Sequence, residues 1–132
     1  MKYVVMLKTD GTTKILEVPE KASYDWYADQ IDCDWIEVVR PKHIKKECVL
    51  IVDEEGLLKD RIMWNPHASA MYGFLEHGQP IAGDCLLMRE EPGEDGYHLV
   101  GLEEAEARGW KQELDDSIAD ILKEIYHKIE TE

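Results

Sequence analysis

The sequence lacks an apolar run long enough to cross a membrane. A spanning helix needs roughly 20 consecutive apolar residues, whereas the apolar runs at residues 3–7 and 48–52 are only about five residues long. The chain begins MKYVVMLKTDG and has no small-residue cleavage site after its short apolar run, so we expect a strand there and not a signal peptide. We therefore predict a cytoplasmic protein with no membrane partner.

Cysteine is scarce and odd in number. The chain has three, Cys33, Cys48 and Cys85, and they are widely spaced beside apolar residues. Because a disulfide framework in a small domain uses an even set of cysteines, we predict reduced, buried thiols. The five histidines share no metal-ligand spacing with one another or with the cysteines. We predict no metal site and no cofactor.

Catalytic and phosphate-binding motifs are also missing. The sequence has no glycine-rich phosphate loop and no GxSxG nucleophile motif, and Ser23, Ser69 and Ser117 have no evident base beside them. Nothing in the sequence requires an enzyme, and we predict no catalytic residue. The fold class is therefore easier to predict than an activity.

Positive charge is in deficit. Aspartate and glutamate outnumber lysine and arginine by 29 to 15, which gives a formal net charge of −14. Residues 1–50 are nearly balanced, with 9 acidic and 8 basic groups, whereas residues 51–132 hold 20 acidic and 7 basic groups. Such a chain repels phosphate backbones, so we predict no direct binding to nucleic acid.

The acidic excess is densest between residues 90 and 106, where carboxylates meet no lysine or arginine. Two interpretations remain open: a solvated surface that keeps the protein soluble, or a patch that meets a basic partner or imitates DNA phosphates. On the second interpretation, the predicted interaction surface consists of Glu90, Glu91, Glu94, Asp95, Glu103, Glu104 and Glu106.

The length of 132 residues corresponds to about one domain, and the hydrophobic share of 44% is typical of folded globular proteins. Strand patterns occur at residues 3–7, 14–18, 35–39, 48–52, 81–88 and 97–102, and Asp10-Gly11 predicts a hairpin turn. We predict a single α+β domain whose mixed, mostly antiparallel sheet carries two or three packed helices. Gly83 is expected to form a bulge, and residues 90–96 are expected to form a loop.

Two short helices are predicted. Ser23 caps the first, which ends near residue 31. Asn65 caps the second, Pro66 takes its first position and Gly78 ends it. Its expected buried face consists of Ala68, Met71, Tyr72 and Leu75.

Residues 103–132 predict a long amphipathic C-terminal helix. Its apolar residues recur at intervals of three and four: Leu114, Ile118, Ile121, Leu122, Ile125 and Ile129. We expect residues 1–102 to form an α+β core domain and residues 103–132 to be a helical extension. The apolar stripe of this extension packs on the core or at a homodimer interface, because an exposed stripe would be an association surface.

Four residues are candidates for binding a small ligand. Asn65 and the amides at the helix start offer a place for an anion, although we favour a plain capping role for Asn65. Trp64, His67 and Tyr72 offer a wall against which a flat ligand could stack. The predicted ligand-binding residues are Asn65, His67, Tyr72 and Asp84.

Carboxylates at the ends of neighbouring strands raise a further alternative. Asp53, Glu54 and Asp84 could perform general acid–base chemistry, which needs two such groups in different environments. Solvation of turns explains all three without any chemistry.

The succession IEVV, VDEEG, NPHAS and PIAGD, followed by an apolar run, resembles the small family labelled domain of unknown function 3846, found mainly in phages and mobile elements of bacteria. The resemblance covers about residues 1–102. It implies a compact α+β protein encoded beside phage or plasmid genes, with no accepted activity. The residues that carry the pattern are Glu54, Gly56, Asn65, Ala68, Gly83 and Asp84.

Three functions remain as hypotheses. The first is a non-catalytic accessory protein of a phage or mobile element that binds a host protein, such as a defence component, through its acidic surface. The second is a binding protein for a nucleotide-like or other anionic small molecule. The third is a small enzyme that uses Asp and Glu side chains for acid–base chemistry.

Overall fold

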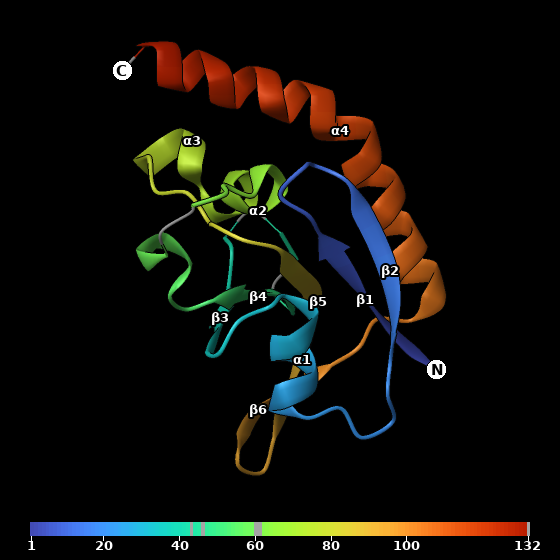
Figure 1. The fold of residues 1–132 in the computed structure, drawn as a ribbon. Helices are drawn as coiled ribbons and strands as arrows, with labels where there is room; N and C mark the ends of the chain where they lie inside the picture. The colour runs from blue at the N-terminus through green and yellow to red at the C-terminus, as the bar shows by residue number, and fades with distance from the viewer. Residues whose placement is uncertain (43, 46, 60–61, 132) are drawn as a thin grey trace.

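A sheet of six strands forms the middle layer of the protein (Figure 1). The structure is a computed structural model and describes residues 1–42, 44–45, 47–59 and 62–131. The strands follow the order β2-β1-β5-β4-β3, and β6 pairs with β5 beyond the end of β1. Their bounds are β1 (Lys2–Leu7), β2 (Thr13–Val18), β3 (Ile36–Val39), β4 (Cys48–Asp53), β5 (Cys85–Gly93) and β6 (Gly96–Val100). Every strand pairing within the described residues is antiparallel.

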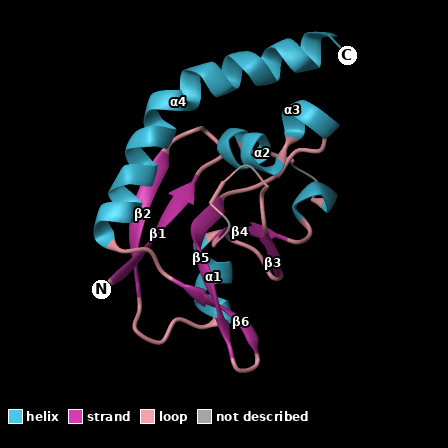
Figure 2. Cartoon of the chain, turned by 180° about the vertical axis from the view of Figure 1, so that it is seen from behind, coloured by secondary structure: helices cyan, strands magenta, loops and turns pink. Residues whose placement is uncertain are grey.

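Helices cover both faces of this sheet (Figure 2). One face carries α1 (Tyr24–Gln30), and the other carries α2 (Pro66–Tyr72), α3 (Phe74–His77) and α4 (Glu104–Thr131). A short 3₁₀ turn, η1 (Gly56–Leu58), follows β4. The predicted α+β class, with its antiparallel sheet and long C-terminal helix, is confirmed.

The two helical layers follow from alternation along the strands. Successive side chains of a strand point to opposite faces. On β1, Val5 and Leu7 join the core beneath α2 and α4, whereas Val4 and Met6 join the core beneath α1. The central strands are thus buried on both sides, which explains why β4 is a continuous apolar run.

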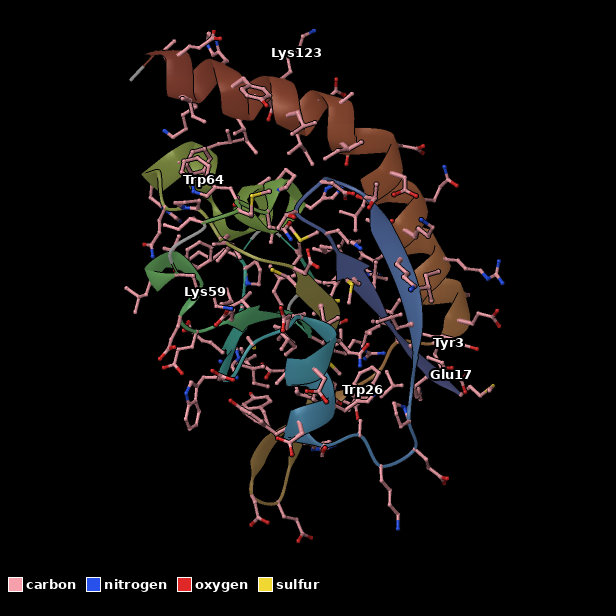
Figure 3. All side chains as sticks on the ribbon, viewed as in Figure 1. Tyr3, Glu17, Trp26, Lys59, Trp64 and Lys123 are labelled. Carbon is pink, nitrogen blue, oxygen red and sulfur yellow. The ribbon has the colours of Figure 1, made fainter. Side chains whose placement is uncertain are left out.

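The long helix α4 packs against its own chain. It runs beside β2 and then passes over α2 and α3 (Figure 1), while Lys123 points away from the body of the protein (Figure 3). The Nζ atom of Lys111 donates hydrogen bonds to the carbonyl and hydroxyl oxygens of Thr13 at 3.1 and 3.0 Å, and it lies 2.9 Å from Asp115 Oδ2. Buried contacts come from Ala107, Leu114 and Ile125.

Three details differ from the sequence prediction. The helix expected over residues 65–78 breaks at Gly73, whose φ of +103° is left-handed and ends α2. As a result Phe74 is buried in α3, and Leu75 is only half-buried. Strand β5 begins at Cys85 and continues to Gly93, so most of the predicted loop at 90–96 is a hairpin.

The three cysteines are free thiols, and burial raises the pKa of each. A raised pKa keeps a thiol protonated and unreactive. Within the described part of the chain, no helix combines the length and the apolar character needed to cross a bilayer.

Candidate functional site

Asn65 is completely buried and joins three parts of the fold. Its Nδ2 donates hydrogen bonds to the carbonyl oxygens of Leu7 at 2.7 Å and Gly83 at 3.0 Å. Its Oδ1 accepts the backbone N–H of Ala68 at 3.0 Å, which caps α2. Both amide protons and the carbonyl oxygen are therefore engaged within the protein. This geometry favours the capping alternative for Asn65 over an anion-binding role.

Asp84 lies at the same end of the sheet and also holds backbone in place. Its Oδ1 accepts the N–H of Thr9 at 3.0 Å, and this bond fixes the turn between β1 and β2. Nearby, the hydroxyl of Ser69 accepts the N–H of Ile81 at 2.9 Å. These bonds tie the segment before β5 to the hairpin and to α2, so Asp84 has a structural role in this geometry.

The expected wall of Trp64, His67 and Tyr72 is divided between different places. Trp64 packs edge-on against Phe74 beside α3 (Figure 3). Tyr72 packs edge-on against His77 and lines a pocket of only about 100 Å³. His67 lines a separate cleft between α2 and α4. The structure thus brings none of Asn65, Tyr72 or Asp84 to the cleft that His67 lines.

The carboxylates considered for acid–base chemistry are engaged in turns. Asp53 Oδ2 lies 2.7 Å from the Nζ of Lys59, and Asp53 Oδ1 accepts the N–H of Glu55 at 2.9 Å. The Lys59 side chain comes from the segment after η1 (Figure 3). Asp84 binds Thr9, as described above. The two aspartates are therefore held separately by local hydrogen bonds, and this arrangement gives no support to a paired acid and base.

The cleft between α2 and α4, which we name the α2–α4 cleft, has a volume of about 590 Å³. This volume lies within the range of roughly 300–1,000 Å³ that is common for small-molecule sites. His67 lines the cleft, yet its side chain is 0% exposed and neither ring nitrogen has a hydrogen-bond partner within the described residues. Burial lowers the pKa of His67, and the backbone of Gly11 and the charge of Asp115 oppose this shift. The imidazole is therefore neutral near pH 7.

The walls of the α2–α4 cleft combine apolar and charged groups. Met71 from α2 faces Trp110 and Ile121 from α4. The charged groups are Lys45, Glu106 and Glu113. Among these residues, the sequence analysis did not single out Lys45, Trp110 or Glu113. It predicted Met71, Ile121 and Glu106, but each in another role. The available signal was the helical spacing of residues 106, 110, 113, 117 and 121, which places them on one face of α4.

A second candidate surface is the outer part of the β5–β6 hairpin, residues 91–98, which we name the acidic ribbon. Here β5 pairs only with β6, and the two strands extend beyond the rest of the sheet (Figures 1 and 2). Every residue from 91 to 98 is exposed. The ribbon carries Glu91, Glu94 and Asp95, and the Tyr97 side chain is 66% exposed.

The other predicted surface carboxylates are paired with cations. Glu90 is only 7% exposed and accepts two hydrogen bonds from Arg40, the longer at 2.9 Å. The prediction that Glu90 belongs to an interaction surface is therefore wrong. In the sequence Glu90 stands at the start of the acidic segment, between Arg89 and Glu91, and the arginine that pairs with it, Arg40, is 50 residues away.

At the start of α4 the predicted carboxylates also have partners. Glu103 pairs with Lys2, and Glu104 lies 2.9 Å from the guanidinium of Arg108. Glu106 lies 3.7 Å from Arg89. On the ribbon, Glu91 lies 4.0 Å from Arg89, and neither Glu94 nor Asp95 has an ion pair within the described residues. The unneutralised part of the predicted surface is therefore the tip of the acidic ribbon, with Glu94 and Asp95.

These features define a single-domain α+β protein with helices on both faces of an antiparallel sheet, a projecting acidic hairpin and a cleft beneath its last helix. Across the described residues, no group of three or more His, Cys, Asp or Glu side chains is arranged to hold a metal ion.

The chain belongs to the family described as Domain of unknown function (DUF3846), whose family model matches residues 1–115. The match extends past residue 102 into the first part of α4, so this helix start belongs to the family domain. Comparisons with curated proteins and with solved structures gave no match.

Replacing Asn65 tests its structural role. Asn65→Ala removes the hydrogen bonds to the carbonyl oxygens of Leu7 and Gly83 and the cap on the N–H of Ala68, so we expect a loss of about 2–4 kcal/mol in the free energy of unfolding. Ser23→Ala is the matched control, because Ser23 Oγ caps α1 with one exposed bond. It should cost about 1 kcal/mol or less. Urea titration measures both values, and equal losses would contradict the role assigned to Asn65.

Acid should destabilise the protein through His67. Because the pKa of His67 is lowered in the folded state, the unfolded chain takes up a proton first as the pH falls. The folded protein therefore loses stability as the pH drops below the usual pKa of a histidine side chain. His67→Leu removes both this effect and the unpartnered nitrogens. We expect the variant to be about 1 kcal/mol more stable than the wild type near pH 7.5.

The pH dependence separates this account from a simple packing change. The stability difference between His67→Leu and wild type should grow as the pH is lowered from about 7.5 to about 5.5. The other histidines and Asp115 are present in both proteins, so their contributions cancel to first order. Differential scanning calorimetry across this range measures the effect. A difference that stays constant with pH would contradict it.

Proposed function

We propose that the protein is a non-catalytic accessory protein of a phage or mobile element that binds a basic surface on a host protein in the cytoplasm. A component of a host defence system is one partner of this kind. The acidic ribbon is the binding element. The observation that carries the proposal is the contrast between the tip of this ribbon, where Glu94 and Asp95 are exposed and have no ion pair within the described residues, and the other carboxylates of residues 90–106, which are paired.

The geometry of the ribbon suits insertion into a groove. Both of its strands are exposed along residues 91–98, so the hairpin can be surrounded by a partner without disturbing the sheet. Tyr97 adds a large amphipathic ring beside the charges. Tyrosine is enriched among the residues that contribute most to protein interfaces. Carboxylates around such an anchor mainly increase the association rate and the specificity for a basic partner.

The overall charge supports the same choice of partner. A net charge of −14 attracts basic surfaces over a distance comparable to the Debye length and repels nucleic acid. The acid–base alternative has no supporting geometry, because Asp53 and Asp84 are engaged in separate turns. The anionic-ligand alternative is also disfavoured in the α2–α4 cleft, where two carboxylates outnumber one lysine.

Reversing the ribbon charges should abolish partner binding. The triple variant Glu91→Lys, Glu94→Lys, Asp95→Lys replaces the three acidic side chains of the ribbon. The matched control is Asp120→Lys, Glu124→Lys, Glu130→Lys, which makes the same change in net charge at exposed positions of α4. Affinity capture from host lysate with quantitative mass spectrometry compares the two variants with the wild type.

We expect a basic host protein to be captured by the wild type and the α4 control but lost with the ribbon variant. Its binding should weaken at least about tenfold between 0.05 and 0.5 M salt, because exposed charges are screened. Circular dichroism confirms that both variants fold. Identical capture by the wild type and the ribbon variant, or binding that is insensitive to salt, would overturn the proposal.

A further inference from the structure

The buried imidazole of His67 is costly as the structure stands. Both ring nitrogens are closed off from solvent, and neither forms a well-aligned hydrogen bond within the described residues, although the backbone of Gly11 lies close enough to raise the pKa of the ring. A buried polar group without a partner typically costs about 1–3 kcal/mol. His67 is nevertheless placed at the α2–α4 cleft, next to a space large enough for a small molecule. An occupant that hydrogen-bonds to the imidazole would offset this cost.

We propose that the α2–α4 cleft binds an uncharged or cationic planar nitrogen heterocycle. This function is independent of the acidic ribbon, which lies on a different part of the sheet. Three properties of the cleft select the ligand class: the protonation state of His67, the apolar walls and the sign of the charges at the rim.

The imidazole selects for a hydrogen-bonding ring. A neutral histidine offers one N–H donor and one nitrogen acceptor, and burial keeps His67 neutral by lowering its pKa. Ring nitrogens and exocyclic amines of a heterocycle match either atom. In this structure the imidazole is closed off from solvent, so the ligand reaches it only after a side chain of the cleft lining, such as Met71, changes rotamer. Methionine is well suited to such a change because its side chain is unbranched and flexible.

The walls select for a flat, apolar body. Trp110 is half-buried on α4, with Met71 and Ile121 lining the same cleft. A planar ring stacks favourably on an indole, and a thioether adds favourable contacts with aromatic rings. The volume of about 590 Å³ accommodates a ring system of nucleoside size.

The charges select against phosphate and carboxylate groups. Glu106 and Glu113 lie on the cleft face of α4, and Lys45 is the one described cation in the lining. The chain as a whole carries −14. Glu106 is paired with Arg89, so Glu113 is the carboxylate that attracts a protonated amine, whereas an anionic group entering the cleft would meet the negative field of the chain. The ligand class therefore differs from the anionic molecules first considered from the sequence.

The test uses adenosine as an uncharged probe, 2-aminobenzimidazole as a cationic probe and adenosine 5′-monophosphate as the anionic counterpart of adenosine. Protein labelled with ¹⁵N at histidine and at the tryptophan indole is titrated with each and followed by NMR. We expect adenosine or 2-aminobenzimidazole to shift the His67 ring nitrogens and the Trp110 indole signal. Adenosine 5′-monophosphate should bind at least about tenfold more weakly than adenosine.

Two variants connect binding to the cleft. Trp110→Ala removes the stacking wall and should weaken binding at least about tenfold, whereas Trp35→Ala, at an exposed tryptophan outside the cleft lining, should leave it unchanged. Since Trp110→Ala also removes core contacts, Ala70→Leu provides a second route, because it fills the cleft from α2. Thermal melting shows which variants remain folded.

The proposal is overturned if neither heterocycle shifts the His67 and Trp110 signals up to its solubility limit. It is also overturned if the phosphorylated probe binds as tightly as adenosine, or if folded Ala70→Leu protein binds adenosine and 2-aminobenzimidazole as well as the wild type does.

Discussion

The buried side chain of Asn65 is the constraint on which the fold depends. Its amide joins the end of β1, the segment before β5 and the first turn of α2, three regions that are far apart in the sequence. The Gly83 carbonyl oxygen accepts one of these hydrogen bonds, and the Ala68 N–H donates another. Three of the six residues that carry the resemblance to the family, Asn65, Ala68 and Gly83, therefore meet at one hydrogen-bonded junction. They identify the fold, and they leave the functional surfaces to be found elsewhere.

Ion pairing then decides where the acidic charge can act. The sequence places seven carboxylates in one segment, but the fold brings Arg40 to Glu90 and Lys2 to Glu103. An exposed ion pair contributes little stability, commonly below about 1 kcal/mol. Its consequence here is the distribution of charge within residues 90–106: the other carboxylates of this segment have ion-pair partners, and the hairpin tip with Glu94 and Asp95 has none within the described residues. A solubilising surface would not require such a projection.

The sequence was sufficient for the sheet and for most helix ends, because alternation, capping residues and the Asp10-Gly11 turn act locally. It failed at Gly73, where a left-handed residue divides a helix whose periodicity continues, and at the hairpin around residue 94, whose polar residues are typical of a loop. The α2–α4 cleft could not be predicted because it depends on how α4 crosses α2. His67 was among the residues predicted from the sequence, but most of the other residues that line the cleft come from a helix about 40 residues later in the chain.

Site-specific photo-crosslinking in cells tests the central claim, binding through the acidic ribbon, most directly. A photoreactive phenylalanine analogue replaces Tyr97 on the ribbon or Tyr126 on α4, and these side chains are similarly exposed, at 66% and 62%. The account predicts that Tyr97 becomes linked to one basic host protein and that Tyr126 does not. Equal crosslinking from both positions, or none from the ribbon in cells where the partner is present, would contradict it.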